Sequence, residues 1–245
     1  IIGVQEGLEE VEVHLVYANR KSLEKNTFRK KYSIDELKTF YENVIRKYFS
    51  FHIMLMKQKN EMKESIEQLA FPFQTYRKGQ RSLMNATYKS ILENKRLFAK
   101  ASTGIGKTIS TVFPTLKQIS LNKAKRIMYV TAKNSTRKVA EDTFGLLINK
   151  GLKATIITIT AKEKVCFQEE VRCQKDYCPF ANGYYDRLQE GLEDILSNEY
   201  LMNTKKIEDY ARKHQLCPFE FSLDIALYAD VIICDYNYFF DPKVK

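Results

Sequence analysis

The chain has 245 residues, of which 44% are hydrophobic and 29% are charged, so its composition is that of a globular protein and not of a disordered one. It contains no run of about 18 apolar residues, which argues against a membrane-spanning helix. The formal net charge of +10 favours a polyanionic partner such as nucleic acid, although a lysine-rich proteome would give the same balance.

The first residues, IIGVQEGLEE, have neither the basic start nor the apolar core of a signal peptide. We therefore expect a cytoplasmic protein. An initiator methionine is also missing, and we expect the chain to be part of a longer protein.

The N-terminal part is predicted to form a strand and then a long helical segment. Residues 9–17 (EEVEVHLVY) alternate polar and apolar side chains, which predicts a half-buried strand. Ser33 and Glu36 form the capping-box pattern of a helix start, and apolar residues recur at helical spacing over residues 33–50. A charged helical connector follows until Phe71-Pro72-Phe73 breaks it, so we expect a domain boundary near residue 70.

Strand-like and helical segments alternate through the rest of the chain, which predicts an α/β fold with a parallel sheet and crossover helices. Helices are expected over residues 77–94 and from Ser135. The predicted strands are residues 96–101, 126–132, 154–160 and 229–236. A mostly helical insertion that carries cysteines, residues 161–225, interrupts this alternation.

A phosphate-binding loop is predicted between strand 96–101 and the next helix. The run matches the pattern G-x-x-x-x-G-K-[ST], except that Ala101 replaces the first glycine. Its two glycines allow the backbone N–H groups to point at phosphate oxygens, and the following helix start favours anions. Lys107 is expected to reach the β- and γ-phosphates of ATP, and Thr108 to ligate Mg²⁺. The predicted nucleotide-binding residues are Ala101, Ser102, Thr103, Gly104, Ile105, Gly106, Lys107 and Thr108.

Upstream of the loop, Arg77 and Gln80 lie three residues apart and would share one face of a helix. An amide side chain can both donate to and accept from the edge of adenine. A lone glutamine is usually an ordinary surface residue, but its spacing from the phosphate loop predicts that Gln80 faces the nucleotide.

Four of the five cysteines lie in the insertion and are candidate metal ligands, because thiolates clustered in a polar segment suit a tetrahedral zinc or an iron–sulfur cluster. Their spacing, C-x6-C-x4-C-x38-C, leaves both metals open. The candidate ligands are Cys166, Cys173, Cys178 and Cys217. Cys234 lies in the apolar run VIICDY and is predicted to be a core residue.

The loop, the four cysteines and residues 228–242 (YADVIICDYNYFFDP) together resemble the DinG/XPD family of superfamily 2 DNA helicases, over about residues 70–245. In that family a loop A-x-T-G-x-G-K-T is followed by four cysteines that hold a [4Fe–4S] cluster. The resemblance implies that the four insertion cysteines bind such a cluster and that Arg77 and Gln80 serve the adenine-side motif. It also implies that Thr131 and Lys133 contact the backbone of single-stranded DNA.

The sequence lacks two features of this family, the acidic box and the second motor lobe. It has no DEAH-type acidic box, and the family places its Tyr-Asn-Tyr segment before that box, so Asp235 is not predicted to be the box aspartate. It also lacks the second motor lobe. Residues 1–65 resemble the tail of a PD-(D/E)xK nuclease-like domain, as found on some bacterial DinG-like helicases, but without its catalytic set.

We therefore expect four regions. They are a nuclease-like tail with connector (1–70), the first part of a RecA-like lobe (71–160), an iron–sulfur insertion (161–225) and a continuation of the lobe (226–245). The intact protein is expected to be a monomeric ATP-dependent helicase that moves 5′→3′ on single-stranded DNA and unwinds forked duplexes, whereas this chain alone would lack turnover. The alternative is a non-motor switch that binds nucleotide and nucleic acid and carries a redox-sensing or zinc module.

Overall fold

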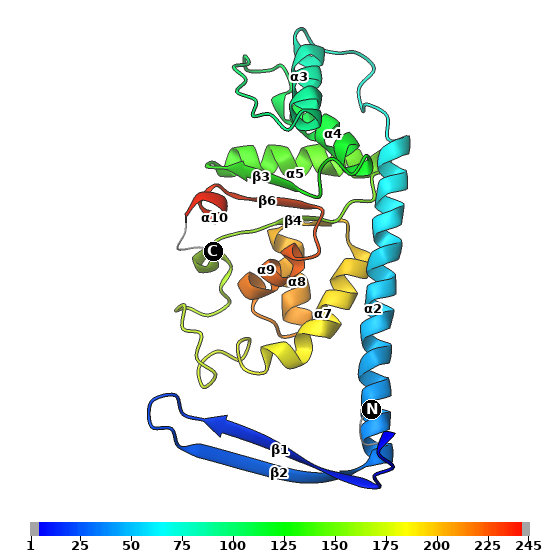
Figure 1. The fold of residues 1–245 in the computed structure, drawn as a ribbon. Helices are drawn as coiled ribbons and strands as arrows, with labels where there is room; N and C mark the ends of the chain where they lie inside the picture. Colours follow the sequence, from blue (N-terminus) through cyan, green and yellow to red (C-terminus); the bar gives the residue numbers. More distant parts are fainter. Residues whose placement is uncertain (1–4, 242–245) are drawn as a thin grey trace. The chain divides into compact units, whose positions relative to one another are not determined.

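The computed structural model describes residues 5–241 (Figure 1). Residues 1–4 and 242–245 lie outside the described part, and with them the start of the predicted nuclease-like tail and Pro242 of the helicase-like segment. The chain divides into two compact units, Ile1–Met56 and Lys57–Lys245.

The first unit contains an antiparallel hairpin of strands β1 (Glu10–Ala18) and β2 (Lys25–Ser33), followed by the start of helix α2 (Ile34–Gln68). The strand predicted over residues 9–17 is confirmed as β1, but all of its residues except Val11 are exposed, so the expectation of a half-buried strand was wrong. Strand β2 was not expected from the sequence.

The capping box at the start of α2 is confirmed. The Ser33 backbone N–H donates to Glu36 Oε2 at 2.8 Å, and the Glu36 N–H donates to Ser33 Oγ at 3.2 Å. The helix runs for 35 residues, so the predicted helix and the predicted connector form one continuous element. Its last turns, from Lys57 to Gln68, belong to the second unit.

The second unit is built on a four-stranded sheet of β3 (Ile127–Thr131), β4 (Ile156–Thr158), β5 (Leu201–Met202) and β6 (Val231–Asp235). The strand order is β3-β6-β4-β5, and every pairing is parallel. The predicted α/β class is therefore confirmed. Three of the four predicted strands are present, and all three are shorter than expected.

Helices cover both faces of this sheet (Figure 1). Helix α5 (Asn134–Asn149) lies over one face, and α8 (Thr204–Lys213) and α9 (Pro218–Ala226) lie over the other. The remaining helices are α3 (Gln80–Leu92), α4 (Lys107–Ser120), α6 (Lys162–Val165), α7 (Tyr184–Asn198) and α10 (Asn237–Phe240). Because β5 pairs with β4, the cysteine-bearing region contributes a strand to the main sheet.

The strand predicted over residues 96–101 is absent, and this prediction was wrong. The segment forms no regular structure, and Phe98 is 94% exposed. A short apolar run becomes a strand only where another strand supplies hydrogen-bond partners and a surface to cover. In the part of the chain that the structure describes, no strand pairs with these residues.

One hydrophobic cluster joins the sheet to the helices of its α5 face. The end of α2 belongs to this cluster, because Met62 and Ile66 are fully buried and Leu69 is 4% exposed. Helix α4 contributes Ile109, Val112, Leu116 and Ile119, helix α5 contributes Ala140, Phe144 and Leu147, and the strands contribute Ile127, Ile156, Val231 and Ile233. The last turns of α2 are thus part of the core of the second unit.

Candidate nucleotide-binding site

The predicted phosphate loop lies at the start of helix α4, whose first residue is Lys107. Gly104 and Gly106 have φ angles of +84° and +80°, in the left-handed region that favours glycine. A Cβ atom added at Gly106 would lie 2.5 Å from Gln80 Nε2, so a larger residue does not fit there without displacing Gln80. The loop therefore needs glycine at this position for both its backbone conformation and its packing.

The structure brings Arg77 and Gln80 to this loop. Helix α3 begins only at Gln80, so the expectation that the two residues share one face of a helix was wrong. Gln80 is 2% exposed, and its Oε1 accepts a hydrogen bond of 3.0 Å from the Arg77 backbone N–H. The Arg77 guanidinium donates to the carbonyl oxygen of Gly104. The two residues thus connect the start of α3 with the loop.

Lys107 and Thr108 occupy the first turn of α4. Lys107 Nζ donates to the carbonyl oxygens of Ala101 and Ser102 at 3.2 and 3.0 Å, so its charge lies over the loop. Thr108 Oγ1 lies 3.4 Å from the hydroxyl of Tyr129 on β3. Tyr129 was not among the predicted site residues, and its only signal in the sequence was a polar hydroxyl in an apolar strand.

A cleft of about 760 Å³ opens beside the loop, a size that suits a small-molecule ligand. One wall comes from α5, and another comes from the segment between α2 and α3, which the sequence analysis treated only as a helix break. The lining residues are Pro72, Phe73, Gln74, Thr75, Arg77, Gln80, Gly104, Gly106, Lys107, Thr108, Ile109, Val139, Thr143 and Leu146. Six of the ten predicted nucleotide residues thus line one cleft, and the other four, Ala101, Ser102, Thr103 and Ile105, do not line it.

The predicted DNA contacts lie at the carboxyl end of strand β3. Thr131 is the last residue of β3, opposite Asp235 of β6, and Lys133 precedes helix α5 and is exposed. The Lys133 backbone N–H donates to Thr131 Oγ1 at 3.3 Å. The two residues are therefore neighbours, and their contact with DNA stays a prediction.

The four insertion cysteines are spread over separate segments. Cys166 follows α6, Cys217 precedes α9, and Cys173 and Cys178 lie in the loop between α6 and α7. Among residues 5–241, no group of three or more His, Cys, Asp or Glu side chains is arranged to hold a metal ion. Burial raises the pKa of the Cys217 thiol, and the backbone N–H groups of Glu220 and Phe219 oppose this shift. That these four cysteines bind a metal stays a prediction.

Two contacts nevertheless connect the cysteine segments. Arg187 Nη2 donates to the carbonyl oxygens of Asn182 at 2.7 Å and Gln215 at 2.8 Å, which links the loop after Cys178 to the one before Cys217. Lys162 donates to Glu220 Oε1 at 2.9 Å. Burial opposes the charge of Lys162, yet Glu220 and the Cys173 thiol raise its pKa overall.

Cys234 is the core residue that the sequence predicted. It is fully buried in strand β6, opposite Val130 of β3. Burial raises the pKa of its thiol to about 11, so it is neither a nucleophile nor a metal ligand at neutral pH.

The DEAD_2 family model matches residues 121–245, just over half of the chain. The chain belongs to the DEAD_2 family. The assignment confirms the resemblance to DinG/XPD-type superfamily 2 helicases that the loop and the YNY-containing segment indicated. The nuclease-like tail stays a prediction.

Curated relatives of this DEAD_2 chain include the "General transcription and DNA repair factor IIH helicase subunit XPD" of Dictyostelium discoideum, 22% identical over 216 residues. The match covers 75% of this chain and 27% of that relative. "Regulator of telomere elongation helicase 1" of Bos taurus is 26% identical over 137 residues, which cover 49% of this chain and 10% of the relative. The chain therefore spans about a quarter or less of these proteins.

Two solved structures match part of the DEAD_2 chain. "XPD_Helicase" has a TM-score of 0.48 at 17% identity, covering 70% of this chain and 30% of that one. "Truncated XPD" has a TM-score of 0.45 at 19% identity, covering 66% of this chain and 46% of that one.

Among the helices that the structure describes, none has both the length and the apolar composition of a membrane span.

Proposed function

We propose that the protein containing this chain is an ATP-dependent DNA helicase, and that the chain forms part of its first motor lobe. The cleft beside α4 carries this proposal, because it places the loop glycines, Lys107 and Thr108 next to Arg77 and Gln80. Membership of the DEAD_2 family and the names of the curated relatives support the same function.

In this proposal the cleft binds ATP with its phosphates at the start of α4, where free backbone N–H groups and the helix dipole favour anions. Lys107 would leave the carbonyls of Ala101 and Ser102 and bind the β- and γ-phosphates. Thr108 would hold Mg²⁺, which neutralises charge on the phosphates when bound. Arg77 and Gln80 would contact the adenine side.

The motor function extends beyond this lobe. Hydrolysis would drive 5′→3′ movement on single-stranded DNA and unwinding of forked duplexes, with Thr131 and Lys133 on the phosphate backbone. The basic balance of the chain, a formal net charge of +10, is consistent with a polyanionic partner. The attacking water would be activated by an acidic box that this sequence does not contain.

The Lys107→Ala variant of the intact protein tests the ATPase. We expect loss of DNA-stimulated ATP hydrolysis and of unwinding, with little change in the far-UV circular dichroism spectrum. Lys138→Ala, which removes an exposed lysine of α5, is the control and should keep wild-type activity. Undiminished hydrolysis by Lys107→Ala would refute the assignment of the cleft.

We further propose that Cys166, Cys173, Cys178 and Cys217 hold a [4Fe–4S] cluster, which requires the cysteine segments to move closer together than they lie here. Anaerobically purified protein should then contain iron and absorb visible light, and Lys107→Ala should stay brown. Cys217→Ser should lose this absorption, and Cys234→Ser should not. Bound zinc with colourless protein would instead favour a zinc module.

A further inference from the structure

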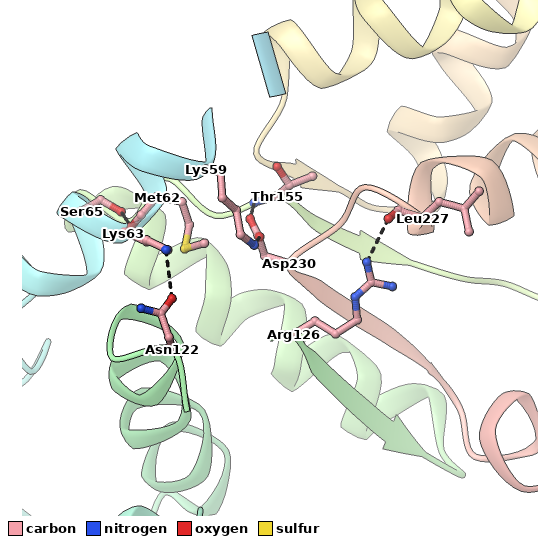
Figure 2. Close-up of polar contacts among 9 residues, drawn as sticks. All are labelled: Lys59, Met62, Lys63, Ser65, Asn122, Arg126, Thr155, Leu227 and Asp230. Atoms are coloured by element: carbon pink, nitrogen blue, oxygen red, sulfur yellow. Dashed lines mark hydrogen bonds and ion pairs between the residues drawn. The ribbon is translucent and has the colours of Figure 1, made fainter. Parts of the chain in front are cut away.

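The last turns of helix α2 are bound to the rest of the second unit by polar contacts as well as by the hydrophobic core (Figure 2). Lys59 Nζ lies 2.6 Å from Asp230 Oδ1, and Lys63 Nζ lies 3.0 Å from Asn122 Oδ1. Ser65 Oγ accepts a hydrogen bond of 3.0 Å from the backbone N–H of Lys153. These contacts reach the sheet, the end of α4 and the segment before β4.

The carboxyl end of α2 receives a further partner from the phosphate-loop helix. Lys117 of α4 donates to the carbonyl oxygen of Ile66, and at 3.1 Å to that of Glu67. The last four carbonyl groups of a helix lack partners within it and favour a cation, but α2 has no basic residue in its own last turn. Lys117 therefore acts as the C-terminal cap of α2.

The segment that leaves this capped end forms a wall of the cleft. Phe71 stacks on Tyr76 with ring centroids 4.7 Å apart and meets the edge of Phe113 at 5.5 Å. Phe113 lies one turn before Lys117 on α4, and Lys117 Nζ is 5.6 Å from the centre of its ring. Pro72 and Phe73, which follow, line the cleft.

Helix α4 begins at the phosphate loop. Its residues Lys117 and Phe113 contact the end of α2 and the start of the segment that lines the cleft. We propose that Lys117 is a positioning residue for nucleotide binding. It fixes the position of the cleft wall formed by residues 72–75, and the position of this wall determines the affinity for the base of the nucleotide. This inference rests on the proposed ATP-binding function of the cleft. Lys117 itself does not line the cleft.

Binding measurements on the intact protein can separate this role from general stabilisation. The probes are a fluorescent ATP analogue, for the whole nucleotide, and inorganic tripolyphosphate, for the phosphate end alone. In Lys117→Met, which keeps the chain length but removes the charge, we expect ATP-analogue affinity to fall about five- to tenfold, as the loss of a hydrogen-bonded anchor implies. Tripolyphosphate affinity should stay within about twofold of wild type, and Lys117→Arg should restore the affinity for the ATP analogue.

Lys59→Met is the matched control, because it also removes a lysine that anchors α2 but lies at the Asp230 contact and not at the cleft wall. Both methionine variants should lower the melting temperature, and only Lys117→Met should weaken ATP-analogue binding. Unchanged affinity in Lys117→Met, or an equal loss in Lys59→Met, would overturn the inference. If wild-type protein bound neither probe, the proposed ATP-binding function itself would fail. If it binds both, Lys107→Ala should weaken both probes, which shows that they occupy the cleft.

Discussion

Lys59 on helix α2 and Asp230, which directly precedes strand β6, form an ion pair of 2.6 Å, although they are 171 residues apart in the chain. The Asp230 side chain is 7% exposed, and its second oxygen accepts a hydrogen bond of 3.0 Å from the Thr155 backbone N–H. One carboxylate therefore joins α2, the segment before β4 and the strand β6, as Figure 2 shows.

Replacing this carboxylate should destabilise the fold. We expect Asp230→Ala to lower the free energy of unfolding by about 1–3 kcal/mol, because the buried Thr155 N–H loses its acceptor and Lys59 loses its partner. Urea unfolding followed by circular dichroism measures this change. Asp142→Ala removes an exposed i,i+4 pair with Lys138 and should change the free energy by less than about 0.5 kcal/mol.

Two glycines inside helices should respond to alanine with opposite signs. A Cβ at Gly191 of α7 would lie 2.6 Å from Leu216 Cδ1 and 3.4 Å from the Phe221 ring, so Gly191→Ala should lower the melting temperature. At Gly145 of α5 the nearest atom is Leu201 Cδ2 at 3.8 Å, and Gly145→Ala should stabilise by about 0.5–1 kcal/mol. Stabilisation by both substitutions would show that α7 packs less tightly than described.

Gly106→Ala should impair the nucleotide cleft more than the fold. The substitution is strained at φ +80° and places a methyl group 2.5 Å from Gln80 Nε2, so we expect ATP-analogue affinity to fall at least about tenfold. Gly151→Ala is strained in the same way at φ +103° but faces open space away from the cleft. It should lower stability and leave nucleotide affinity unchanged.

Asp194 should make stability depend on pH in the acid range. Hydrogen bonds from Lys213 and from His214, 2.6 Å each, lower the pKa of this carboxyl in the folded protein. A lowered folded-state pKa gives stability that is present above the unfolded-state value, about 4, and that is lost as pH falls through the folded-state value. The urea midpoint of the wild type should thus decrease between pH 6 and pH 3, and Asp194→Asn should reduce that decrease.

The sequence predicted the features that rest on local chemistry. The Ser33–Glu36 capping box and the buried strand that carries Cys234 both depend on residue types at fixed short spacings. Strand β2 was missed because its sequence, KNTFRKKYS, is basic and does not alternate, and only pairing with β1 makes it a strand.

The failures concern partners that lie far away in the chain. Residues 96–101 have the composition of a strand, but nothing in the sequence revealed that no described strand would pair with them. In the sequence, Lys117 cannot be distinguished from any other helical lysine. Only the fold shows that its ammonium group donates hydrogen bonds to the end of α2. The metal site predicted from the cysteine spacing is not among these failures and stays a prediction.

The extent of α2 decides where the lobe could be cut for recombinant expression. The sequence places a boundary at the Phe71-Pro72-Phe73 break, but a fragment that began there would lose Met62, Ile66 and Leu69 from the core, together with Lys59 and Ser65. The apolar surface uncovered on α4 would invite aggregation. A fragment that begins at Lys57 keeps this surface covered and is the better candidate for a well-behaved isolated lobe.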